Sequence, residues 1–210
     1  MATSILEDDP VVSDGALVLS PDMAGTLMTP QEFDAAEVDP DDGSRYELIK
    51  GMLIVTPIPS EAEADPNEEL GHLLRNYREN HPRGHALDET LAERHVFSGK
   101  NRRRADRVIW AGLGRLPKPR RDPPTIIVEF VSAGRRNRDR DYIEKRREYK
   151  ALGVQEYWVI DRFRRAMTVY GRSGAPAGKT ISEKGVYSTP LLPGFKLPLA
   201  RLFMLADKWK

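Results

Sequence analysis

Residues 125–132, with the sequence Thr-Ile-Ile-Val-Glu-Phe-Val-Ser, form a short apolar run that carries one charge in its middle. β-Branched and aromatic residues over this length, preceded by two prolines, are typical of a buried strand. An unpaired carboxylate in such a strand costs several kcal/mol as an order of magnitude, because burial removes its hydration. We therefore expect a cation beside Glu129, and the identity of that cation bears on the function.

Composition bounds the class of protein. A chain of 210 residues with 31% charged residues and a formal net charge of +1 is typical of one soluble domain. We expect residues 1–25 to form a flexible N-terminal arm and residues 26–210 a single domain. The lack of cysteine excludes disulfides, thiolate metal sites and cysteine nucleophiles. No segment resembles a signal peptide or a membrane helix of roughly 20 apolar residues, so we expect a cytoplasmic protein.

The pattern of apolar residues predicts alternating helices and strands. We expect helices that begin at Thr29, include residues 70–77 and span residues 138–152, and strands over residues 45–57 (a hairpin turning at 50–51), 85–98, 101–110, 125–132, 156–161 and 166–170. Residues 171–185 are expected to form a loop, and residues 187–203 an edge strand with packing segments. This order of elements predicts an α/β or α+β fold, with a mixed β-sheet core flanked by helices.

Arginine is concentrated in residues 100–147, whereas residues 1–42 are rich in Asp and Glu. A basic surface beside an acidic site suits a polyanionic partner, and a solvated arginine-rich face is the alternative. Phosphate contacts of this kind give affinity without sequence preference. The candidate nucleic-acid contacts are Arg102, Arg103, Arg104, Arg135, Arg136 and Arg138.

Acidic side chains recur in strand-like segments whose neighbours are apolar. Asp106 precedes Val-Ile-Trp, Glu129 lies within the apolar run, and Glu47 precedes Leu-Ile in the hairpin. If the strands of Asp106 and Glu129 pair, their carboxylates point at one spot and repel each other unless a proton or a divalent cation lies between them. Such oxygen-rich sites suit Mg²⁺ or Mn²⁺.

Lys145 lies in the helix predicted to follow the central strand. Spacings of three and four residues place it on one helical face with Asp141, Glu148 and Tyr149. A lysine near paired carboxylates can orient water or offset the negative charge of a phosphate. The alternative is an ordinary surface ion pair, worth roughly a few tenths of a kcal/mol.

Several of these segments together resemble the Uma-two family, a group of bacterial proteins regarded as endonucleases within the PD-(D/E)XK, restriction-endonuclease-like superfamily. The similarity runs from about Thr29 to Phe203, and its most specific piece is residues 153–161, Gly-Val-Gln-Glu-Tyr-Trp-Val-Ile-Asp. The other segments that carry the resemblance are Tyr46–Gly51, Ala105–Ile109, Ile127–Ser132 and Lys145.

The resemblance implies a restriction-endonuclease-like mixed sheet with Glu47, Asp106 and Glu129 around Mg²⁺ or Mn²⁺. The superfamily pattern has a lysine two residues after the strand glutamate, where this chain has Val131. In this family the lysine has moved to the following helix, and Lys145 matches that place. These four residues are therefore the expected catalytic set, with the three acids as metal ligands.

Two further acids match positions next to this set. Asp141 corresponds to a family position one turn before Lys145 and is expected to hold Lys145 or to reach the site. Glu63 stands where the family usually has a histidine shortly after the first hairpin. Glu63 can act as a metal ligand or base, and an altered or inactive site is the alternative.

The leading hypothesis is a Mg²⁺-dependent endonuclease that hydrolyses phosphodiester bonds in DNA, with a homodimer as one compatible assembly. A non-catalytic nucleic-acid-binding protein on the same scaffold is the second hypothesis. The third is an assembly or regulatory protein in which the acids pair with the arginines. No base-reading module is visible, so the sequence does not predict a cleavage specificity.

Overall fold

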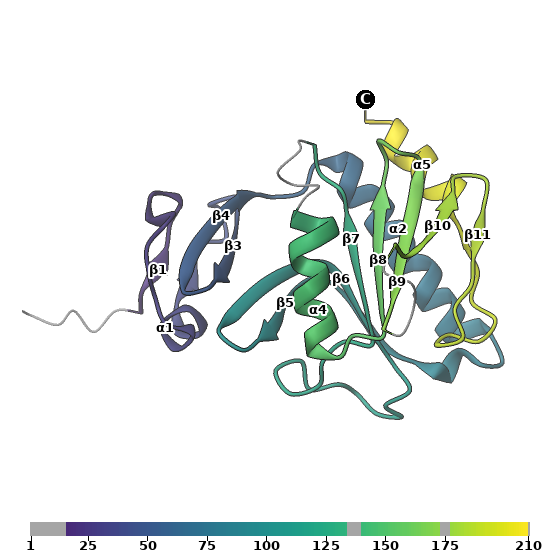
Figure 1. Cartoon of the computed structure of the whole chain (residues 1–210), viewed down its shortest axis with the longest axis horizontal. Helices are drawn as coiled ribbons and strands as arrows, with labels where there is room; N and C mark the ends of the chain where they lie inside the picture. Colours follow the sequence, from purple (N-terminus) through teal and green to yellow (C-terminus); the bar gives the residue numbers. More distant parts are fainter. Residues whose placement is uncertain (1–15, 134–139, 173–176, 210) are drawn as a thin grey trace, which may run out of the picture.

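The computed structural model describes residues 16–133, 140–172 and 177–209, apart from the side chains of Arg140 and Asp141, and is built around an eight-stranded sheet (Figure 1). Its strands are β3 (Ser44–Ile49), β4 (Met52–Pro57), β5 (Leu87–Ser98), β6 (Asn101–Ala111), β7 (Ile126–Phe130), β8 (Glu156–Asp161), β9 (Ala166–Gly171) and β10 (Lys179–Ser182). They lie in the order β10-β9-β8-β7-β6-β3-β4, and β5 also pairs with β6. Only β7 and β8 run parallel within this sheet, so it is mixed, as predicted.

Helices and smaller elements surround the sheet. The helices are α1 (Pro30–Ala35), α2 (Glu61–Asn80), the π-helix η3 (Arg140–Lys145), α4 (Arg146–Leu152) and α5 (Leu199–Asp207), with 3-10 turns η1 (Pro21–Met23) and η2 (Gly84–Ala86). Two small sheets pair β1 (Val18–Leu19) with β2 (Glu37–Val38) and β11 (Val186–Tyr187) with β12 (Leu197–Pro198). Within the described residues, no helix is long and apolar enough to cross a membrane.

The sheet separates two apolar layers, and β7 contributes to both. Ile126, Val128 and Phe130 pack in the layer covered by α2 and α5, whereas Ile127 belongs to the layer covered by α4. Successive side chains of a strand point to opposite faces. Glu129 therefore belongs to the α4 face, together with Ile127.

Several helix ends and turns form where local sequence signals predict them. Thr29 begins α1 with a capping box, in which its hydroxyl accepts from the Glu32 N–H while the Glu32 carboxylate accepts from the Thr29 N–H. The hairpin of β3 and β4 turns at Lys50 and Gly51, whose φ angles of 53° and 82° suit a two-residue turn of mirror-image type. Gly153 ends α4 in the left-handed region.

Two predictions for the C-terminal part are wrong. The segment predicted as a loop over residues 171–185 contains β10, which pairs with β9. In place of an edge strand over residues 187–203, the chain forms the small β11–β12 sheet and helix α5. Spacings of three and four residues put Leu199, Leu202 and Phe203 on one buried helical face. That helical period was the signal for α5.

The N-terminal boundary stays a prediction, because residues 1–15 lie outside the described residues. From β1 onward the segment is packed: Leu19 is buried in a cluster with Tyr46, Leu48 and Leu53 of the β3–β4 hairpin. Residues 18 and 19 pair with β2 as a short parallel ladder.

Candidate active site

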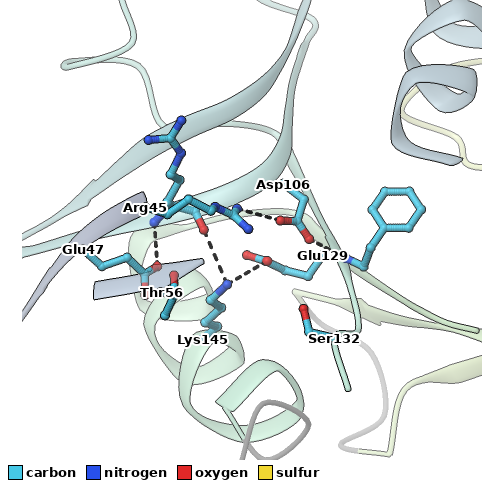
Figure 2. A pocket seen from close by; sticks show the side chains of 9 residues that line it. Arg45, Glu47, Thr56, Asp106, Glu129, Ser132 and Lys145 are labelled. Atoms are coloured by element: carbon cyan, nitrogen blue, oxygen red, sulfur yellow. Dashed lines mark hydrogen bonds and ion pairs between the residues drawn. The ribbon is translucent and has the colours of Figure 1, made fainter. Parts of the chain in front are cut away.

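One pocket contains all four side chains of the expected catalytic set (Figure 2). Glu47 comes from β3, Asp106 from β6, Glu129 from β7 and Lys145 from the last residue of η3. The rest of the lining consists of Arg45, Thr56, Arg104, Phe130 and Ser132. Segments separated by up to about a hundred residues in the sequence thus meet at one place, where three acids and three bases share a small volume.

Sheet register brings Asp106 next to Glu129. β6 and β7 are antiparallel, and the pair of Arg107 with Val128 ends their ladder. Asp106 and Glu129 come next along the two strands, and the Phe130 N–H donates to Asp106 Oδ2 over 2.6 Å. The two strands therefore pair, which is the condition under which the sequence places both carboxylates at one spot.

Lys145 is the cation beside Glu129. Its Nζ lies 2.7 Å from Glu129 Oε2, and the Tyr149 hydroxyl donates to Glu129 Oε1 over 3.0 Å. The Lys145 side chain is only 3% exposed, so the alternative of an ordinary surface ion pair is wrong. Burial and the nearby Glu129 charge raise the pKa of Tyr149 well above its usual range, which keeps its hydroxyl protonated as a donor.

Asp106 has a different cation, Arg45. The Arg45 guanidinium donates to Asp106 Oδ1 over 2.8 Å, and the same nitrogen lies 2.8 Å from Glu93 of β5. Arg45 was not predicted as a site residue. The signal was its position two residues before Glu47 on β3, because this spacing puts both side chains on one face of a strand.

Glu47 is tied to the backbone of β6. Its Oε1 accepts a hydrogen bond from the Arg104 N–H over 2.7 Å, and its Oε2 lies 3.9 Å from the Arg103 guanidinium. Glu47 is buried, and a buried carboxylate requires hydrogen-bond partners of this kind. The Lys145 ammonium contacts the same strand through the Arg104 carbonyl at 3.5 Å.

A family model described as "Uma2: Putative restriction endonuclease" matches residues 30–200, most of the chain. The chain belongs to the Uma2 family. A solved structure described as a putative nuclease belonging to DUF820 from Anabaena variabilis ATCC 29413 has the same fold. Its TM-score is 0.64 at 14% sequence identity, over 85% of this chain and 99% of that chain. No curated protein matches the chain.

The Uma2 match and the shared fold confirm the predicted family and the restriction-endonuclease-like fold class. In this chain the fold is held on the far side of β6 by α2. Asn67 donates to the Asp106 carbonyl over 2.8 Å and accepts from the Arg107 guanidinium over 2.7 Å. α2 therefore fixes the strand segment that carries Asp106.

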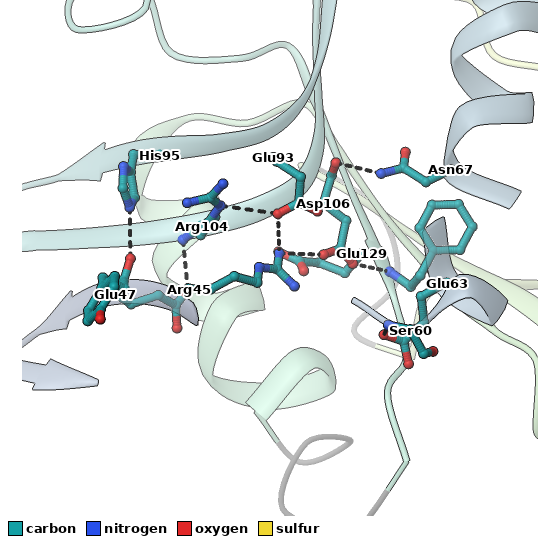
Figure 3. Close-up of polar contacts among 12 residues, drawn as sticks. Arg45, Glu47, Ser60, Glu63, Asn67, Glu93, His95, Arg104, Asp106 and Glu129 are labelled. Atoms are coloured by element: carbon teal, nitrogen blue, oxygen red, sulfur yellow. Dashed lines mark hydrogen bonds and ion pairs between the residues drawn. The ribbon is translucent and has the colours of Figure 1, made fainter. Parts of the chain in front are cut away.

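Glu63 lies at the first turn of α2, outside the pocket lined by the four expected residues. It is buried and accepts from the Ser60 N–H over 3.3 Å, the reciprocal half of a helix capping box (Figure 3). Burial first, and then the Asp106 charge, raise the pKa of this carboxyl. Glu63 and Phe130 also line an adjoining, mainly apolar pocket against α5. A helix-capping role accounts for these contacts.

Arg102 and Arg103, which were predicted to contact phosphates, are buried and form ion pairs inside the protein, and their phosphate contacts stay a prediction. Arg102 binds Asp34 through two hydrogen bonds of 2.8 and 2.9 Å, and Arg103 is 1% exposed and paired with Glu148 at 2.6 Å. Both guanidiniums already have carboxylate partners inside the protein. Arg104 also pairs with a carboxylate, Glu93, at 3.1 Å, but its side chain is 30% exposed and lines the pocket.

The remaining predicted residues lie where the structure does not describe side chains. Arg135, Arg136 and Arg138 fall within residues 134–139, outside the described residues, as does the Asp141 side chain. Their predicted contacts with phosphate and with Lys145 stay predictions. The backbone of residue 141 belongs to η3, consistent with the helix predicted after the central strand.

Carboxylate oxygens are the donors that Mg²⁺ and Mn²⁺ prefer, and Glu47, Asp106 and Glu129 present them to one pocket. The donor set therefore fits such an ion in its chemistry. Among the described residues, however, no group of three His, Asp or Glu is arranged to hold a metal. The carboxylates of Asp106 and Glu129 are bound by Arg45 and Lys145 instead.

Proposed function

We propose that this chain is a divalent-metal-dependent endonuclease that hydrolyses phosphodiester bonds in DNA. The observation that carries the proposal is the pocket in which Lys145 is buried against Glu129 while Asp106 lies beside it at the end of the β6–β7 ladder. Membership of the Uma2 family supports a nuclease in general. The proposal goes beyond family membership in two respects: the dependence on a divalent metal and DNA as the substrate.

Asp106 and Glu129 would hold Mg²⁺ or Mn²⁺, with Glu47 as the third carboxylate of the pocket. When bound, such an ion lowers the pKa of water and stabilises negative charge on a phosphate. Lys145 keeps a positive charge at Nζ inside the pocket, where it orients the attacking water and offsets charge on the phosphate. Tyr149 keeps the Glu129 carboxylate in place through its hydroxyl.

Among the described residues that line this pocket, Arg104 is the cation that suits a DNA phosphate best, because its side chain is 30% exposed. Arg135, Arg136 and Arg138 stay candidates for contacts further along the backbone of the DNA. Such contacts give salt-sensitive affinity with little sequence preference.

The proposal is tested by measuring how fast the protein nicks supercoiled plasmid DNA in Mg²⁺, in Mn²⁺ and in the presence of a chelator. We expect metal-stimulated nicking that falls by about 100-fold or more in Asp106→Asn and Glu129→Gln, since each change removes a negative charge from the metal site. Glu61→Gln, an exposed change on α2, is the matched control and should keep wild-type activity. Full nicking by both site variants would refute the roles of these carboxylates.

A non-catalytic DNA-binding protein is the second candidate, and the observation that favours it is that Arg45 and Lys145 already neutralise Asp106 and Glu129. Titration calorimetry separates the two functions. DNA affinity without any binding of millimolar Mg²⁺ or Mn²⁺ would favour the second candidate. Sedimentation in the same buffers tests the homodimer, which stays a prediction.

A further inference from the structure

Arg45 lines the pocket and lies between the carboxylates of Asp106 and Glu93 (Figure 3). One of its terminal nitrogens is 2.8 Å from Asp106 Oδ1 and also 2.8 Å from Glu93 Oε2. The side chain is 13% exposed, so this charge is largely shielded from water. A single cationic nitrogen thus bridges two acids, in the way that a bound cation would.

Every oxygen of the two proposed metal-binding carboxylates has a donor. Asp106 receives Arg45 at Oδ1 and the Phe130 N–H at Oδ2. Glu129 receives Tyr149 at Oε1 and Lys145 at Oε2. The Phe130 N–H is fixed by the sheet, whereas Arg45 is a long side chain with several rotatable bonds. A divalent cation that approaches Asp106 Oδ1 therefore meets a like charge, and that charge can move.

Glu93 offers Arg45 a second place to bind. Its Oε2 accepts Arg45 and Arg104, while its Oε1 is buried and has no hydrogen-bond partner within the described part of the chain. Arg45 can therefore leave Asp106 without losing its counter-charge. A guanidinium has five N–H donors, enough to serve both oxygens of Glu93.

The backbone at Glu93 supports a dedicated role for this acid. Glu93 adopts φ of 53° in the middle of β5, between the pairs Ala92–Arg107 and Arg94–Ala105. Residues other than glycine rarely adopt this left-handed conformation, and they keep it only where surrounding contacts impose it. Here the imposed conformation accompanies a side chain that binds Arg45 and Arg104.

We propose that Arg45 is a built-in competitor for the divalent cation at Asp106, and that metal binding transfers Arg45 from Asp106 to Glu93. Arg45 is a positioning residue in this scheme, since it acts on the metal through Asp106. The inference rests on the proposed role of Asp106 as a metal ligand. It adds a control on metal affinity that operates inside the pocket.

Calorimetric titration of Mn²⁺ into the full chain, without DNA, tests the competition. We expect Arg45→Met to bind Mn²⁺ about tenfold or more tightly than wild type, because the repelling charge is removed from direct contact with Asp106. Arg104→Met is the matched control. It removes the same charge from the same pocket without touching Asp106, and should change the affinity by less than about threefold. Thermal unfolding of each variant confirms that it is folded.

A double-mutant cycle tests the transfer to Glu93. We expect Glu93→Gln to weaken Mn²⁺ binding, because Arg45 then lacks its alternative carboxylate and stays on Asp106. In the Arg45→Met background the same change should have little effect. A Glu93→Gln effect of equal size in both backgrounds would overturn the transfer, since it would then arise from the lost negative charge alone.

The outcomes separate this inference from the proposed function. Mn²⁺ binding by wild type with equal or weaker binding by Arg45→Met overturns the competition and leaves the nuclease proposal standing. Lack of Mn²⁺ binding by both proteins overturns both. If Arg45→Met does not fold, Arg45→Gln, which retains hydrogen-bonding capacity, takes its place in the same titrations.

Discussion

Asp106 and Arg107 are neighbours on β6, and both are buried charges, but they point to opposite faces of the sheet and are stabilised differently. Asp106 faces the pocket, where the guanidinium of Arg45, shared with Glu93, neutralises it. Arg107 is 0% exposed beneath α2, where two oxygens of Asn67 accept its hydrogen bonds, and the Thr90 hydroxyl of β5 accepts another. The nearest carboxylate, Glu68 Oε1 of α2, lies 3.9 Å away.

This difference distinguishes a charged residue of the candidate active site from one that stabilises the fold. A charge balanced by another flexible charge can exchange its partner, for example for a metal ion. A charge whose hydrogen bonds go to neutral acceptors on a packed helix and strand cannot do so without opening the core. Burial lowers the pKa of Arg107 to about 10, which still leaves it protonated at neutral pH. We therefore assign Asp106 to the chemistry and Arg107 to the attachment of α2.

The largest effect is expected in the pocket, on the rate of DNA nicking. Lys145→Met should lower the rate of metal-stimulated plasmid nicking by about 10²–10³-fold, the usual loss when one charged donor is removed from a reaction centre. Lys150→Met, one turn further along and exposed, is the matched control and should retain activity. Wild-type rates for Lys145→Met would show that its ion pair with Glu129 is structural only.

Substitution of Arg107 should change the stability of the protein rather than its activity per folded molecule. Arg107→Met should lower the free energy of unfolding by about 2–4 kcal/mol, because the acceptors on Asn67 and Thr90 stay buried without a donor. Urea unfolding measures the change, and the exposed Arg75→Met should stay within about 0.5 kcal/mol of wild type. A neutral result for Arg107→Met would remove the distinction drawn between the two charges.

A smaller effect is expected at the helix surface that accommodates Arg107. A Cβ atom at Gly71 would lie 2.6 Å from the nearest nitrogen of the Arg107 guanidinium. Gly71→Ala should therefore destabilise the protein by about 1–3 kcal/mol, because the guanidinium must shift in a packed interface. Combining it with Arg107→Met should reduce the penalty, and additive penalties in urea unfolding would contradict this contact.

The smallest effect is expected at the ion pair between Arg102, which is also on β6, and the partly exposed Asp34 of α1. The hydrogen bond from Arg102 lowers the pKa of Asp34 below 3.8, so its contribution to stability is present above that pH and is lost as the pH falls through the folded-state pKa. Asp34→Asn should cost about 1 kcal/mol at pH 7. The difference from wild type should shrink below about pH 4 in acid unfolding curves, and a difference that stays constant down to pH 2 would exclude this linkage.

Much of the fold was predictable because its signals are local. The capping box at Thr29, the turn at Lys50–Gly51 and the apolar strand around Glu129 each lie within a few consecutive residues, and each forms as predicted. α5 was missed because its short apolar period follows a segment rich in proline and glycine. β10 was missed because it is short and gains its order from pairing with β9.

For the site, an acid within an apolar strand is visible in the sequence, so the sequence alone predicts Glu47, Asp106 and Glu129 as site residues. The sequence by itself determined which charges had to find partners. Only the tertiary structure decided the partners: Arg45 reaches Asp106 from β3 and is shared with Glu93 of β5. Arg102 and Arg103 turn inward to Asp34 and Glu148, which lie 68 and 45 residues away in the sequence. Burial is a local property of an apolar strand, whereas the choice of a counter-ion depends on register and on which strands lie side by side.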